Sequence, residues 1–214
     1  MWCCLVGSEM CIRDRCYYLY FATYVFNSMF QIKKSLIILF ALVLMSEFTN
    51  ANSNSRYQII IDISEQRLYL FEKEVLKQSF PVSTSSFGEG SKENSFKTPL
   101  GLHQIKSKIG TNVPINTIFI ARENTNKKAK IINEKIDSAD DFVTSRILWL
   151  DGLEIGKNKG SGVDSYDRYI YIHGTHEEGL IGQKASHGCI RMFNQDVIYL
   201  YEKVKEGTKV FIRT

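Results

Sequence analysis

The stretch IHGTHEEGLIGQKASHGCIRM, residues 172–192, contains three of the four histidines of the chain and one cysteine, Cys189. The other four cysteines lie within the first sixteen residues. A thiol attacks other molecules as its thiolate, and because its free pKa is about 8.5 it needs a base or a positive neighbour near neutral pH. Histidines and an arginine surround Cys189, so the stretch predicts a nucleophilic cysteine.

The residues next to Cys189 are of the types that acyl transfer requires. His173 is expected at the end of a strand over residues 169–173, where a rigid element would aim it as a general base. Gly188 lets the backbone approach a substrate without a Cβ in the way. The backbone amides of His187, Gly188 and Cys189 are expected to converge as an oxyanion hole, which stabilises tetrahedral intermediates.

Simpler interpretations stay open for each residue. Cys189 can be a buried small hydrophobic residue, and His173 can be structural. Arg191 adds positive charge two residues after the thiol, but it can also be a surface charge. His176 stands among acidic residues and is expected to be exposed, and His103 lies in an expected strand. We assign neither of these two histidines a role.

A metal site is the rival chemistry for this stretch. His173, His176, His187 and Cys189 are residue types that bind zinc. Their spacing matches no standard zinc pattern, and no His-Glu-x-x-His motif is present. We therefore expect neither a metal nor another cofactor.

Composition restricts the class of protein. The chain has 214 residues, of which 44% are hydrophobic and 23% charged, which is typical of one globular domain with a real core. The net charge is +4, and no block of five or six like charges occurs, so nucleic-acid binding is disfavoured.

The first 56 residues read as segments outside the folded domain. Residues 1–28 mix four cysteines with aromatic residues, and CLVGSEMCIRDR resembles translated sequencing-adapter sequence. We expect residues 1–28 to be artefactual, a genuine extension being the alternative. Residues 29–51 have two lysines, a short apolar run and small residues before Ala51, which is typical of a signal peptide. An uncleaved anchor is the alternative, and residues 52–56 are expected to be a linker.

A signal peptide predicts export to the periplasm or cell envelope, where conditions are oxidising. Without residues 1–28 the chain has a single cysteine, Cys189, which then has no partner for an intramolecular disulfide. This favours a reactive thiol over a structural one.

The remaining residues, 57–214, are expected to form one catalytic domain that is mostly β. Short runs of β-branched and alternating apolar residues predict a β-rich sandwich or barrel. Two polar segments, residues 83–97 and 157–167, are expected to be loops, and residues 124–167 include a long polar stretch whose role is open. The expected strands cover residues 57–63, 66–71, 79–83, 102–106, 117–122, 146–150, 169–173 and 209–213.

One helix is expected over about residues 194–206. Asn194 is a good N-cap residue, and Gly207 a natural stop. Apolar residues recur at helical spacing and give the helix one apolar face; they are Val197, Leu200, Tyr201 and Val204. A weaker pattern predicts a second helix over residues 133–143.

These motifs resemble the L,D-transpeptidase family of the YkuD type. Its catalytic signature is a histidine, a spacer of about a dozen residues and Ser/Thr-His-Gly-Cys, and here His173-Gly174-Thr175 precedes Ser186-His187-Gly188-Cys189-Ile190-Arg191-Met192. Residues 59–71, 80–84 and 98–101 are similar to earlier family segments. The resemblance covers residues 57–212; Ser85-Ser86 depart from the glycine that members often have there.

The resemblance implies a β-rich sandwich-like fold and a periplasmic enzyme of peptidoglycan biosynthesis, which affects cell-wall organisation and cell shape. Cys189 would attack the carbonyl before the terminal D-alanine of a tetrapeptide stem, release D-alanine and form a thioester. A second stem would then give a 3→3 cross-link. It implies His173 as general base, Gly174 as the carbonyl that orients it, and oxyanion-hole amides at His187, Gly188 and Cys189. Arg191 and Ser186 would bind substrate.

The acceptor stays open. Water would make the protein an L,D-carboxypeptidase, and an outer-membrane lipoprotein would make it a lipoprotein-to-wall transferase. A different class, a non-catalytic peptidoglycan-binding domain, is also compatible with this fold. The expected partners are peptidoglycan stem peptides, and we expect a monomer.

Overall fold

The computed structural model of the chain describes residues 55–214. The expectations for residues 1–28 and 29–51, and most of that for 52–56, fall outside these residues. Within residues 55–214, no helix has both the length and the apolar character that a membrane span requires.

The described part begins with three antiparallel strands, β1 (Tyr57–Asp62), β2 (Arg67–Glu72) and β3 (Val75–Pro81). Side chains alternate between the two faces of β1, so that Ile59 and Ile61 face the core opposite Leu70 and Leu68 of β2, while Ile60 is only partly buried. Lys73 and Glu74 between β2 and β3 both have positive φ, as a tight hairpin turn requires.

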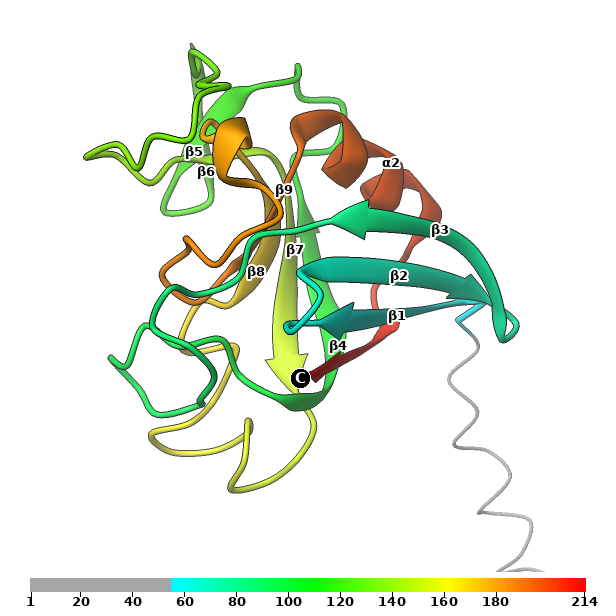
Figure 1. Cartoon of the computed structure of the whole chain (residues 1–214). Helices are drawn as coiled ribbons and strands as arrows, with labels where there is room; N and C mark the ends of the chain where they lie inside the picture. Colours follow the sequence, from blue (N-terminus) through cyan, green and yellow to red (C-terminus); the bar gives the residue numbers. More distant parts are fainter. Residues whose placement is uncertain (1–54) are drawn as a thin grey trace, which may run out of the picture. The chain divides into compact units, whose positions relative to one another are not determined.

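The other strands extend this hairpin into a ten-stranded sheet of order β3-β2-β1-β10-β4-β7-β5-β6, with β8 paired to β7 and β9 (Figure 1). β10 is parallel to β1 and antiparallel to β4, and β9 is parallel to β8. The remaining strands are β4 (Gly101–Ile109), β5 (Thr117–Ile120), β6 (Glu123–Lys128), β7 (Val143–Gly152), β8 (Tyr171–Thr175), β9 (Ile190–Met192) and β10 (Lys209–Arg213).

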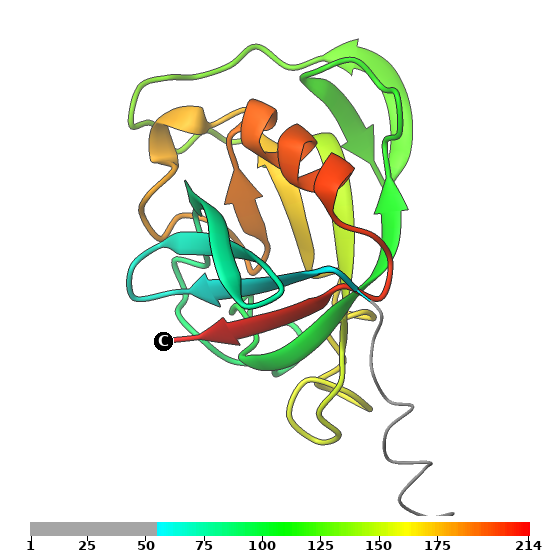
Figure 2. The ribbon, with the colours of Figure 1, turned by 90° about the vertical axis from the view of Figure 1, so that its right-hand side faces the viewer.

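One α-helix, α2 (Asn194–Lys203), packs on β7 and β8 and lies across the sheet in Figure 2. Its buried residues Val197, Leu200 and Tyr201 follow the predicted apolar face and join the core formed by β1, β2 and β10. The only other helical element of residues 55–214 is the short 3-10 helix η1 (Glu178–Leu180). The predicted class, mostly β with one helix, is confirmed.

The predicted N-cap of this helix is wrong. The capping position is Phe193, without a side-chain cap, and the helix ends at Lys203 and not near 206. The backbone N–H of Asn194 donates to the Glu178 carboxylate at 2.8 Å. The Asn194 side chain is buried and bonds to β7 and β8, because its amide both donates and accepts.

The predicted helix over residues 133–143 is also absent. The backbone here pairs with the segment after β8: Ile132 N–H donates to His176 O at 2.8 Å, and Gly179 N–H to Ile132 O at 3.0 Å. A Cβ on Gly179 would lie 2.1 Å from Glu134 O, so the two segments are in close contact. This non-local pairing prevails over a weak helical pattern.

Two strands were not expected. β6 is polar and largely exposed, and β9 has only three residues, so neither has a clear apolar alternation. Residues 124–167 are therefore not one long loop, because they contain most of β6 and all of β7. Residues 83–97 form no named strand, as predicted.

Candidate functional site

The alternation of side chains along β8 places Tyr171 and His173 on one face of the strand. Side chains alternate along a strand, so Tyr171 and His173 share a face and Ile172 points into the main core. His173 lies in the middle of β8 and not at its end, because the strand starts at Tyr171; Tyr169 has φ of 57° and lies outside it. β9 runs parallel to β8, which brings Cys189, the residue before β9, next to Tyr171.

His173 is buried and oriented by a carbonyl. Its Nδ1 lies 2.7 Å from Gly174 O, and since a carbonyl oxygen only accepts, Nδ1 donates and Nε2 keeps its lone pair in the neutral ring. Burial lowers the pKa of His173 to about 4, although the Asp141 carboxylate opposes this shift. The imidazole is therefore neutral and basic at Nε2 near neutral pH.

Cys189 is half-buried, and it is a free thiol among residues 55–214. Its Sγ accepts from the Tyr171 N–H at 3.4 Å and donates to Tyr169 O at 3.4 Å. Burial raises the pKa of the Cys189 thiol to about 12. The resting thiol is thus protonated, and formation of a thiolate would require a base.

The loop before Cys189 is shaped by the Ser186 hydroxyl. Ser186 is fully buried; its Oγ donates to Cys189 O at 2.6 Å and accepts from Gly188 N–H at 3.2 Å. Thr98 Oγ1 donates to Gly188 O at 3.0 Å from the other side. Gly188 has φ of +120°, a conformation that favours glycine. Ser186 therefore holds the loop, and the Gly188 amide already has an acceptor.

Arg191 is not a surface charge but one of the largest fully buried side chains. Its guanidinium lies 2.9 Å from the equally buried Glu177 carboxylate and 2.7 Å from Asp141 Oδ1. In register, Arg191 stands opposite His173 on the paired strand. A buried ion pair of this kind fixes geometry, so Arg191 shapes the site from within.

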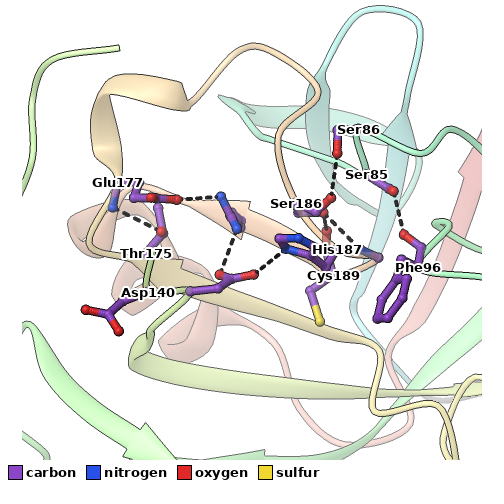
Figure 3. A network of polar contacts seen from close by, with 12 residues as sticks. Ser85, Ser86, Phe96, Asp140, Thr175, Glu177, Ser186, His187 and Cys189 are labelled. Atoms are coloured by element: carbon purple, nitrogen blue, oxygen red, sulfur yellow. Dashed lines mark hydrogen bonds and ion pairs between the residues drawn. The ribbon is translucent and has the colours of Figure 1, made fainter. Parts of the chain in front are cut away.

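Asp141 connects Arg191 to His187. Its Oδ2 accepts from His187 Nδ1 at 3.0 Å, and the His187 ring packs against Phe87 and Phe96, with centroids 5.8 and 6.0 Å away. Burial disfavours the carboxylate of Asp141, but Arg191 and the neighbouring histidines outweigh this and lower its pKa. Figure 3 shows His187 beside Cys189 and Ser186, with Glu177 and Thr175 at the far side of the polar network.

His176 and His103 are the two remaining histidines, and only His176 differs from what the sequence predicted. His176 is buried and not exposed: its Nε2 lies 3.0 Å from Ser138 Oγ, and its ring packs on Phe142 at 4.8 Å. His103 is buried in β4 between Gly101 O and Ser165 Oγ, both at 3.0 Å, and burial lowers its pKa to about 4. Neither histidine belongs to the group around Cys189.

Reasoning from the sequence missed Asp141, Glu177 and Thr98. Asp141 and Thr98 come from segments far from the motif in sequence, and only the folded backbone brings them to it. Glu177 lies inside the motif, but two adjacent glutamates are usually exposed to solvent, so the sequence offers no sign that Glu177 is buried. For residues 55–214, the structure brings no three His, Cys, Asp or Glu side chains together in a way that could hold a metal ion.

Comparison with known families decides the relationship. The model of the YkuD family, the L,D-transpeptidase catalytic domain, matches residues 56–212. The chain belongs to the L,D-transpeptidase family. The predicted resemblance is therefore confirmed, over nearly the range that the motifs indicated.

Similar L,D-transpeptidases match over short segments. They include two Escherichia coli proteins, "Probable L,D-transpeptidase YbiS", 49% identical over 43 residues, and "Probable L,D-transpeptidase ErfK/SrfK", 47% identical over 45 residues. These segments cover 20% and 21% of this chain and 14% of each relative. The chain thus matches only a small part of the length of these curated relatives.

Solved L,D-transpeptidase structures are similar over a larger part of the chain. An L,D-transpeptidase from Mycobacterium smegmatis is 15% identical with a TM-score of 0.46, covering 75% of this chain and 59% of its own. L,D-transpeptidase 3 from Mycobacterium tuberculosis, in complex with a faropenem-derived adduct, is 14% identical with a TM-score of 0.47, covering 75% and 61%.

Proposed function

We propose that this protein is a cysteine L,D-transpeptidase of the cell envelope that acts on tetrapeptide stems of peptidoglycan. The observation that carries the proposal is the hydrogen bond from His173 Nδ1 to Gly174 O. It leaves Nε2 as the basic nitrogen on the face of β8 that Cys189 adjoins. The membership of residues 56–212 in the L,D-transpeptidase family supports the same assignment.

The chemistry proceeds in two acyl transfers. Cys189 Sγ attacks the carbonyl carbon before the terminal D-alanine while His173 Nε2 takes the thiol proton. The tetrahedral intermediate collapses, the C–N bond breaks, and the imidazolium returns the proton to the departing amine of D-alanine. An amine of a second stem then attacks the thioester, giving an amide bond and a free thiol again.

The pKa values make His173 essential to the first step. Burial holds the thiol pKa at about 12 and that of the imidazole at about 4. Neither group is charged at rest, so the proton moves only when negative charge develops on the substrate. We propose the amides of His187 and Cys189 as the oxyanion donors. The Gly188 amide is engaged by Ser186 and is the weaker candidate.

Arg191 and Ser186 take structural roles in this proposal and not direct substrate binding. Arg191 is held by Glu177 and Asp141, and Ser186 by the backbone of Gly188 and Cys189. They keep the loop before Cys189 in place relative to β8. The envelope location rests on the signal peptide proposed for residues 29–51.

The test is incubation of the purified protein with tetrapeptide muropeptides, followed by mass spectrometry of the products and of the intact protein. We expect an acyl adduct on Cys189, release of D-alanine and cross-linked dimers, and loss of all three in Cys189→Ala. His173→Gln should also abolish adduct formation, because the thiol then lacks its base. Full turnover in Cys189→Ala would overturn the proposal.

The products also separate the remaining candidates. Tripeptide without dimers, in the presence of an amine acceptor, would indicate an L,D-carboxypeptidase. Transfer to an added lipoprotein, in place of a second stem, would indicate a lipoprotein-to-wall transferase. Binding to peptidoglycan without any adduct on Cys189 would indicate a non-catalytic binding domain.

A further inference from the structure

A cluster of aromatic rings adjoins the thiol. Trp149 of β7 stacks on Tyr166, with centroids 4.0 Å apart and planes at 13°, and it also contacts Tyr169 at 5.8 Å and Tyr171 at 5.5 Å. Cys189 Sγ bonds to the backbone of both Tyr169 and Tyr171. Tyr169 is 52% exposed, so solvent reaches the cluster beside the thiol.

Arg122 lies on this cluster. Its guanidinium carbon is 4.8 Å from the centroid of the Trp149 ring and 5.0 Å from that of Tyr169, and its Nη1 donates to the Tyr171 hydroxyl at 3.3 Å. Three aromatic side chains thus fix the position of the guanidinium, mainly by cation–π contacts.

The charge of Arg122 has no counter-ion in the described part of the chain. Among residues 55–214 no carboxylate oxygen lies within 4.0 Å of its guanidinium, whereas Arg191 has two such partners. A guanidinium has five N–H donors, and only one of them bonds to Tyr171. A carboxylate is the ligand that best matches the remaining donors, because two parallel hydrogen bonds form.

Arg122 lies in a tight hairpin turn. Ala121 and Arg122 form the two-residue turn between β5 and β6. Their φ angles are 48° for Ala121 and 71° for Arg122. Such turns favour Asn-Gly, since a side chain with a Cβ is strained at positive φ. The turn directs the Arg122 side chain to the rings around the thiol.

We propose that Arg122 binds the terminal carboxylate of the acyl donor, the carboxylate of the D-alanine that leaves; this inference rests on the proposed function. In the donor, this carboxylate is one residue away from the carbonyl that Cys189 attacks. In the protein, the single side chain of Tyr171 separates the thiol from the guanidinium. Arg122 therefore selects donors with a free chain end over internal peptide bonds.

The test compares three donors: the tetrapeptide, its C-terminal amide, and the tetrapeptide amidated at the side-chain carboxyl of its diamino acid. The full protein and Arg122→Gln are assayed for kcat/KM of acyl-adduct formation. We expect Arg122→Gln to lower kcat/KM for the free acid by about 10- to 100-fold, as loss of a charged hydrogen bond does, and to leave the C-terminal amide nearly unchanged.

Two further variants control the experiment. Arg122→Lys keeps the charge but not the planar fork, so its preference for the free acid should be intermediate. Lys127→Gln removes an exposed positive charge from β6 of the same hairpin and should leave all three donors unaffected. If Arg122→Gln does not fold, Arg122→Lys alone decides, because an unchanged acid-to-amide ratio in that variant overturns the proposal.

Other outcomes overturn the proposal in distinct ways. An equal loss for all three donors would make Arg122 a support of the aromatic cluster only. A loss confined to donors with a free diamino-acid carboxylate would assign Arg122 to that group. If the full protein forms no adduct with any donor, the proposed function itself fails; an adduct on Cys189 without acid preference contradicts only the role of Arg122.

Discussion

At the scale of single residues, the charge of Arg191 is the feature on which the site depends. A buried guanidinium is tolerated only when carboxylates face it, and Glu177 and Asp141 do so at 2.9 and 2.7 Å. Because Arg191 stands opposite His173 and two residues after Cys189, a shift of this ion pair would move both residues, the proposed base and the proposed nucleophile.

We therefore predict that Glu177→Ala lowers the free energy of unfolding by about 3–5 kcal/mol, because it leaves Arg191 buried with one partner. Glu89→Ala is the matched control: it breaks a partly exposed pair with Lys184, at 2.6 Å, and should cost at most about 1 kcal/mol. Denaturant unfolding of both variants measures the difference. Equal losses of unfolding free energy in the two variants would mean that the buried pair of Arg191 contributes no more to stability than the partly exposed pair.

The motif alone predicts roles for Cys189, His173 and the glycine between His187 and Cys189, because rare residue types in a fixed order carry that information. It could not show that Arg191 is buried or that Ser186 occupies the Gly188 amide. Those facts depend on which carboxylates and hydroxyls the folded chain brings near, and a one-dimensional pattern does not contain them.

At the scale of elements, the Asn194 side chain attaches α2 to the sheet, whereas the sequence predicted it as the N-cap of the helix. Asn194 Oδ1 accepts from Thr144 and Ser145 of β7 at 2.7 and 2.5 Å, and its Nδ2 donates to Thr175 O of β8 at 2.7 Å. The helix is thus joined to the two strands that it covers, and one of them carries His173.

The two roles of Asn194, N-cap or link between the helix and two strands, predict different stabilities for Asn194→Ser. Serine is as good an N-cap as asparagine, so Asn194→Ser would be nearly neutral if capping were its role. Here a serine cannot reach both strands, and we expect a loss of about 1–3 kcal/mol from unsatisfied buried groups. Thermal or denaturant unfolding measures it; a variant as stable as the parent would restore the capping interpretation.

Strands such as β1 and β10 were predictable because they are short runs rich in β-branched and aromatic residues. β6 was not, since nearly all its residues are exposed and it is ordered by pairing with β5. The false helix over residues 133–143 has a similar origin. Ile132, just before it, bonds to the backbone of His176 and Gly179, and Ser138 N–H donates to the Glu177 carboxylate, all distant in sequence.

At the scale of the whole molecule, two buried histidines make stability depend on pH. Burial lowers the pKa of both His103 and His173 to about 4, against about 6.5 in an unfolded chain. Between these values the unfolded state binds more protons than the folded state. Stability therefore rises with pH in this window and is lost as the pH falls from about 6.5 towards 4.

We predict a slope of up to about 1.4 kcal/mol per pH unit from each histidine between pH 4.5 and 6. His103→Gln should remove about half of this combined slope, because the two buried histidines have different hydrogen-bond partners and similar pKa values. Denaturant unfolding at several pH values gives the slope for both proteins. Identical slopes would show that His103 does not lose a proton on folding.

The position of β10 has a consequence for how the chain comes together. This strand lies between β1 and β4 and joins the first hairpin to the rest of the sheet, pairing Ile59 with Val210. Contacts between such distant segments form slowly, because a long loop must close first. The sheet can therefore be completed only after residues 209–213 have been synthesised, whereas the pairing of Ser83 with Arg191 does not need them.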